Sequence, residues 1–127
     1  MDGYTADIEE LTLKNTNFRT VLFTGNHSQL VLMALKPGED IGEEVHNEND
    51  QFFRFESGVG KAIVEGEEFD VKDGSAVVVK SGSKHNIINT SSTDYLKLYT
   101  IYSPAHHPDG TIHKTKKEAM DAEKEEH

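Results

Sequence analysis

The chain contains no cysteine. This absence excludes disulfide bonds, metal sites built on thiolates and a cysteine nucleophile. Any metal ion that the chain binds must therefore be held by nitrogen and oxygen atoms.

Long apolar runs are also absent, and no stretch approaches the roughly 18 residues that cross a bilayer. The first ten residues are acidic where a secretion signal would be basic and then apolar, since they include Asp2, Asp7, Glu9 and Glu10. We therefore expect a cytoplasmic protein.

Basic residues are few, with 13 Lys and Arg against 23 Asp and Glu, and the formal net charge is −10. Nucleic acids and anionic membranes both attract clustered Lys and Arg. This composition argues against both as partners and leaves a small-molecule ligand as the expected one, while the acidity itself is explained by solubility.

Short alternating or apolar runs, broken by Gly, Asn, Asp and Ser, fill the chain from Phe18 to Thr100. Such a succession is typical of an all-β sandwich or barrel. A length of 127 residues suits one domain, so we expect a single domain over 1–127 with a barrel core at about 18–103. The expected strands are 19–24, 29–36, 41–46, 51–56, 60–65, 67–72, 76–80, 85–89 and 95–102.

The tail from residue 104 to 127 differs in character. A loop with His106 and His107 comes first, and Thr115 followed by Glu118 then fits a capping box at a helix start. We expect a short, solvated helix, because residues 116–126 have almost no apolar stripe. His106, His107 and His113 belong either to a solvated loop or to a lid over the barrel mouth.

Two segments carry potential metal ligands. Glu44 and His46 are two residues apart, so on a strand their side chains share one face. Gln51 opens the next strand after a four-residue turn, and His85 begins a strand directly after a turn containing Gly82. These residues can reach one point from two sides of a barrel.

These two segments resemble the two motifs of the cupin superfamily. In the first, Gly38 is followed after five residues by Glu44-x-His46, after four more by Gln51 and after six more by Gly58. In the second, Gly74 is followed after five residues by Lys80-x-Gly82, after two more by His85 and after three more by Asn89, with Lys80 standing where the motif has proline. The resemblance implies a single-domain β-barrel, a double-sheet jelly roll, similar to the mannose-6-phosphate isomerase-like cupins.

The resemblance also implies one divalent metal ion, bound by Glu44, His46, Gln51 and His85. The corresponding positions in the family usually hold three histidines and one glutamate, so two ligands here have changed chemistry. Two imidazoles and a carboxylate suit Zn, Mn, Fe, Ni or Co, and the neutral amide of Gln51 is a weak ligand. The alternative is a metal-free cupin that keeps the shell.

Aromatic residues on two strands complete the expected cavity. Phe53 and Phe55 share the face of Gln51 and are expected to line the substrate pocket, although at least one of them has a role in the core. Among Tyr95, Tyr99 and Tyr102, a phenol that points inward could donate a proton, and we take Tyr99 and Glu44 as the catalytic candidates.

Three functions fit this site. The first is a metal-dependent isomerase or lyase acting on a small polar, sugar-like substrate, with the metal as Lewis acid. The second is an iron-dependent dioxygenase that uses two histidines and a carboxylate, and the third is a non-catalytic cupin that binds a small ligand. A homodimer is expected, because edge strands of small barrels often pair.

Overall fold

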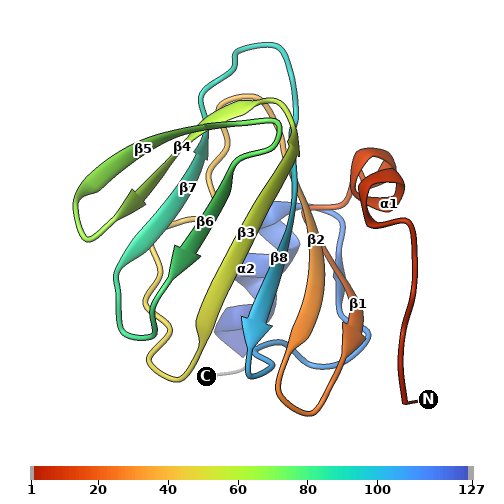
Figure 1. Cartoon of the computed structure of the whole chain (residues 1–127). Coiled ribbons are helices and arrows are strands. Elements are labelled where there is room, and N and C mark those ends of the chain that lie inside the picture. Colours follow the sequence, from red (N-terminus) through yellow and green to blue (C-terminus); the bar gives the residue numbers. More distant parts are fainter. Residues whose placement is uncertain (1, 126–127) are drawn as a thin grey trace.

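Two antiparallel sheets facing each other form the body of the protein, and two helices pack against them (Figure 1). The computed structural model describes residues 2–125, without the side chain of Glu125. This arrangement is the all-β jelly roll expected from the sequence. The elements are α1 (Ile8–Lys14), β1 (Arg19–Thr24), β2 (Gln29–Leu35), β3 (Asp50–Ser57), β4 (Val59–Val64), β5 (Glu67–Lys72), β6 (Ala76–Val79), β7 (His85–Asn89), β8 (Leu96–Ser103), β9 (Ile112–His113) and α2 (Lys116–Glu125).

The larger sheet has the strand order β6-β3-β8-β2-β1-β9. Along β3 and β8 buried residues alternate with half-buried ones, because successive side chains of a strand point to opposite faces. The inner face carries Phe53, Phe55, Leu98 and Thr100, all of them 0% exposed. The core therefore lies between the sheets, and the polar site described below adjoins one end of it.

The smaller sheet has the order β5-β4-β7 and is extended by the segment before β3. The expected strand at 41–46 is wrong, since only two isolated bridges form there, from Asp40 to Ile88 and from Glu44 to His85. Gly42 adopts φ +92°, a left-handed conformation that interrupts a strand. The segment still runs beside β7 and brings Glu44 to its first residue.

The C-terminal helix α2 covers part of the inner side of the larger sheet, and it is seen behind β3 and β8 in Figure 1. Lys116 pairs with Asp40 at 2.5 Å, and Ala119 is fully buried with Met120 packed against the core. The expectation of a solvated helix with almost no apolar stripe to bury is therefore wrong. Residue 126, the last of the expected segment 116–126, lies outside the described residues. Its start is capped as expected, because Thr115 Oγ1 accepts the N–H of Glu118.

The helix α1 packs on the outside near β2, β3 and β8, and the sequence analysis did not predict it. Asp7 caps it by accepting the N–H of Glu10, and the Asp7-x-x-Glu10 spacing is the signal that could have revealed it. Among the described residues no helix combines the length and the apolar character needed to cross a membrane.

Candidate metal centre

Backbone hydrogen bonds place both halves of the site. Glu44 and His85 exchange two of them, each 2.9 Å long, so the two residues lie directly opposite each other. The carbonyl of His46 accepts the N–H of Gly82 at 2.9 Å, and Gly82 adopts φ +84°. A glycine at this turn is therefore what lets the chain pass close to His46 before it enters β7.

The side chains of Glu44, His46 and His85 converge at this point. Glu44 Oε2 lies 2.8 Å from His46 Nε2, and the rings of His46 and His85 have centres 5.4 Å apart. The exposed fractions of His46 and His85 are 8% and 2%. The structure thus brings together three of the four residues that the sequence put forward as ligands.

Gln51 lies in the same region, on β3 beside Tyr102 of β8. Its amide nitrogen donates to Thr100 Oγ1 at 3.0 Å. The ring of Tyr102 in turn lies edge-on to that of His46, with centres 5.7 Å apart. Gln51 therefore adjoins the three convergent side chains through Tyr102.

The buried polar atoms that lack a hydrogen bond within the described part of the chain include three that could donate a lone pair at this end of the barrel: His46 Nε2, Gln51 Oε1 and His85 Nε2. For His46 the nearby carboxylate of Glu44 does not meet the geometry of an N–H···O bond. Buried polar atoms are rarely left unpaired, because each costs free energy. All three atoms can be metal ligands, so the residues present fit a metal ion.

The ring of His85 is prepared for this role. Its Nδ1 lies 3.1 Å from the carbonyl oxygen of Ser83, and only a ring N–H can donate to a carbonyl. In the neutral ring the lone pair is then on Nε2, the atom without a partner. Burial lowers the pKa of His85, which favours the neutral form.

Glu44 has a depressed pKa. Burial alone would raise the pKa, but the close contact with His46 and the electrostatic influence of His46, Arg19 and His85 outweigh it. The carboxylate is consequently ionised at neutral pH and can serve as an anionic ligand.

The two phenylalanines do lie on the inner face, as expected. Phe53 has its ring centre 6.0 Å from that of His85 and borders the site, whereas Phe55 packs further along in the core cluster. Both rings are fully buried in the core cluster, and Phe53 is the one that also contacts His85.

Tyr99 does not face the site, which corrects the choice of catalytic phenol. It alternates with the buried residues Leu98 and Thr100 and therefore lies on the outer face, with its ring 6.3 Å from that of Phe52. Tyr102 is the inward phenol, 1% exposed, and burial raises its pKa. It stays protonated and can donate a hydrogen bond.

Three further residues lie near the site, and the sequence put forward none of them as a metal ligand or catalytic residue, although it offered His106 and His107 as part of a lid. His106 and His107 follow β8 and contact the ring of Tyr102, with centres 5.3 and 5.1 Å away. Burial, followed by the charge of Arg19, lowers the pKa of His107. Arg19, the third, is 1% exposed, and its Nη1 lies 3.3 Å from His113 Nδ1. The sequence signal for its burial is that Arg19 stands two residues before Val21 on β1, so the two side chains point to the same inner face.

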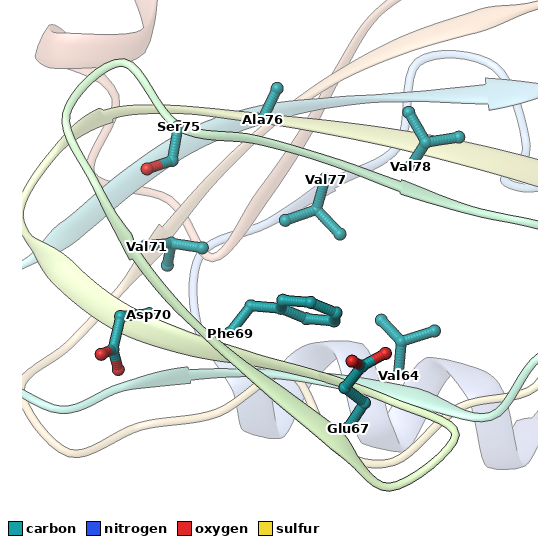
Figure 2. A pocket seen from close by; sticks show the side chains of 9 residues that line it. All are labelled: Val64, Glu67, Phe69, Asp70, Val71, Ser75, Ala76, Val77 and Val78. Carbon is teal, nitrogen blue, oxygen red and sulfur yellow. The ribbon is translucent and has the colours of Figure 1, made fainter.

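An open groove lies elsewhere, between the edge strands β5 and β6 (Figure 2). It has a volume of about 490 Å³, and the ring of Phe69 points into it toward Val77. None of the expected ligands lines it. The residues that line it are Val64, Glu67, Phe69, Asp70, Val71, Ser75, Ala76, Val77 and Val78.

Among the side chains that the structure describes, no three His, Cys, Asp or Glu residues form a finished coordination group. The donors named above are close together, but their atoms do not yet surround one point. Binding of an ion would require adjustment of side-chain orientation.

The fold and the convergent donors define a small double-sheet β-barrel with a polar site at one end. Residues 31–102 match the family described as the cupin domain, and the chain belongs to this family. The crystal structure of BH2720 from Bacillus halodurans is 41% identical, with a TM-score of 0.91 and 93% of each chain covered.

Two curated relatives are similarly close. The uncharacterized protein YrkC of Bacillus subtilis is 47% identical over 94% of this chain and 67% of its own length. The uncharacterized protein L612 of Acanthamoeba polyphaga mimivirus is 51% identical over 86% of this chain and 70% of its own length.

Proposed function

We propose that the protein is a metal-binding cupin that acts as an isomerase or lyase on a small polar, sugar-like substrate. The observation that carries the proposal is the group of three buried atoms without hydrogen bonds: His46 Nε2, Gln51 Oε1 and His85 Nε2. Together with the carboxylate of Glu44, they are the donors that would hold one divalent ion, which is Zn, Mn, Fe, Ni or Co on the chemistry of the set. When bound, such an ion supplies Lewis-acid polarisation of a substrate oxygen.

The protein side chains have separate tasks in this proposal. The Nδ1–H bond to Ser83 fixes the ring of His85, so that Nε2 faces the site. Tyr102 keeps its proton, so this inward phenol, whose ring contacts His46, can donate a hydrogen bond to substrate. Glu44 can accept a proton from substrate only weakly, because its low pKa makes it a poor base. Phe53 shields one side of His85 from water.

The convergence of Glu44, His46 and His85 also supports the second candidate, an iron-dependent dioxygenase, because two histidines and a carboxylate are the donors of such enzymes. Oxygen uptake separates the candidates. Uptake with Fe(II)-loaded protein and none with Zn-loaded protein would favour the dioxygenase.

Metal analysis tests the shared basis of both candidates. Protein would be purified without chelators or added metals, and its metal content compared with that of His46→Ala and His85→Ala. We expect close to one ion per wild-type chain and a large loss in each variant. Wild-type protein with no more metal than the variants would refute the metal site and leave the third candidate, a non-catalytic ligand-binding cupin.

The homodimer remains a prediction, and the groove between β5 and β6 is where we propose that two copies meet. Both strands are sheet edges, and Val78 and Phe69 are 68% and 43% exposed there. Sedimentation of the wild type and of Val78→Lys tests this. A dimer that the substitution leaves intact would contradict it.

A further inference from the structure

His106 lies against the candidate metal site, although it is outside both cupin motifs. His106 follows the end of β8 at Ser103, in the loop that leads to β9. The ring of His106 has its centre 4.3 Å from that of His46 and is stacked on Tyr102 at 5.3 Å. His106 is exposed, so it lies on the solvent side of His46, which is buried.

Two buried amide side chains fix the loop that carries His106. Gln29, 1% exposed, accepts the backbone N–H groups of His106 and His107 at 3.1 and 3.0 Å and donates to the carbonyl of His107 at 2.7 Å. Asn49, 7% exposed, donates to the carbonyl of Pro104 at 2.5 Å. The position of His106 over the site is thus set by contacts that do not involve its own ring.

The spacing of the rings is close to that of imidazoles on one ion. Histidine nitrogens bind zinc at about 2.0–2.1 Å, which puts the ring centres of two ligands about 4.5–5.2 Å apart. The observed spacings from His46 are 5.4 Å to His85, slightly above this range, and 4.3 Å to His106, slightly below it. The rings would therefore shift and turn to direct their nitrogens at one ion.

We propose that His106 is a third imidazole ligand, which closes the metal site from the solvent side. This inference rests on the proposed metal site and extends it. The donors would then be Glu44, His46, His85 and His106, a set of three nitrogens and one carboxylate that favours zinc, nickel, cobalt or iron over magnesium. The neutral amide of Gln51 would be a weaker neighbour of this set.

The neighbouring histidines are placed for other tasks. Nε2 of His107 lies 3.3 Å from Tyr102 Oη, within hydrogen-bonding distance. His113 lies on β9 beside the guanidinium of Arg19. The ring of His46 contacts those of His85 and His106.

Titration of the apo protein with Zn²⁺ and Co²⁺ tests the proposal. The samples are the wild type, His106→Ala, His106→Gln, His46→Ala and, as a matched control, His27→Ala, which removes an exposed histidine from the β1–β2 turn. We expect both His106 variants to lose at least about tenfold in affinity, since even changes in groups that only support ligands cost 10–100-fold. His27→Ala should bind like the wild type.

A structural readout accompanies the affinities. X-ray absorption of the zinc-loaded protein should count three imidazoles in the wild type and two in His106→Ala. Melting of the apo proteins should change little, because Gln29 and Asn49 hold the loop through its backbone. Affinity and imidazole count unchanged in both His106 variants, with binding lost in His46→Ala, would overturn the role of His106 alone. Absence of binding in the wild type would overturn the metal site itself, and the role of His106 with it.

Discussion

Two buried glutamines flank Tyr102 on the inner face of the larger sheet, Gln29 on β2 and Gln51 on β3, and their surroundings differ. Both are at most 2% exposed. The amide of Gln29 is used on both sides: its nitrogen donates to Thr24 and to the carbonyl of His107, and its oxygen accepts two backbone N–H groups. The amide nitrogen of Gln51 donates to Thr100, and its oxygen has no hydrogen bond within the described chain.

The difference separates a structural polar residue from a functional one. A fully satisfied buried amide contributes to stability, because its partners would otherwise be buried unpaired. An unsatisfied buried oxygen costs free energy and persists where it serves another purpose. The two ring nitrogens of His85 show the same contrast. Nδ1 is hydrogen-bonded to the carbonyl of Ser83, whereas Nε2 has no hydrogen bond within the described chain.

Gln29→Met should have the largest effect on stability. It leaves the backbone groups of residues 106 and 107 without partners, and each buried unpaired group costs about 1–3 kcal/mol. We expect a loss of about 2–4 kcal/mol in denaturant unfolding, accompanied by weaker metal binding as the loop with His106 is released. A loss below about 1 kcal/mol would show that water replaces the glutamine and would remove the contrast.

Gln51→Met is the matched substitution on the other side of Tyr102. The substitution removes an oxygen without a hydrogen bond and a single donation to Thr100, so we expect the apo protein to lose about 1 kcal/mol in the free energy of unfolding, less than Gln29→Met loses. Zinc affinity should fall by about tenfold, in the range seen when groups around a metal are altered. The two glutamines would be equivalent if this variant were destabilised as much as Gln29→Met.

Much of this fold follows from local patterns in the sequence. The strands from β3 to β8 could be predicted because apolar alternation and turn glycines such as Gly82 report directly on backbone geometry. The segment at 41–46 could not, because its residues alternate like a strand and only the conformation of Gly42 breaks it. The burial of α2 was missed since one short patch, Ala119 and Met120, is too small to form a readable stripe.

The site was predictable only where it follows strand geometry. Glu44, His46 and His85 come together through the spacing of two motifs and the pairing of Glu44 with His85. Tyr99 and Tyr102 lie on opposite faces of β8, because side chains alternate along a strand. The sequence alone does not show which face is buried, since the buried face includes the polar residue Thr100. His106 was expected only in a solvated loop or a lid over the barrel mouth, because its position depends on Gln29 and Asn49, which are distant in the sequence.

The smallest expected effect concerns the partly exposed ion pair between Asp40 and Lys116. This pair connects α2 to the segment before β3. Burial alone would raise the pKa of Asp40, but hydrogen bonds from Lys116 and Asn86 and the charge of Lys116 hold it below its usual value of 3.8. A carboxyl with a lowered folded-state pKa stabilises the fold above its unfolded-state pKa and loses that contribution as pH falls through the folded-state value.

Asp40→Asn should therefore cost about 0.5 kcal/mol at pH 7, a small value because the side chain of Asp40 is 36% exposed and such pairs are screened. The difference from the wild type should shrink once the pH falls below 3.8. Unfolding at pH 7 and pH 3 measures both, with Asp121→Asn, in the fully exposed pair with Lys117, as the control. A cost at pH 3 as large as that at pH 7 would mean that packing of Asp40, rather than its charge, holds α2 in place.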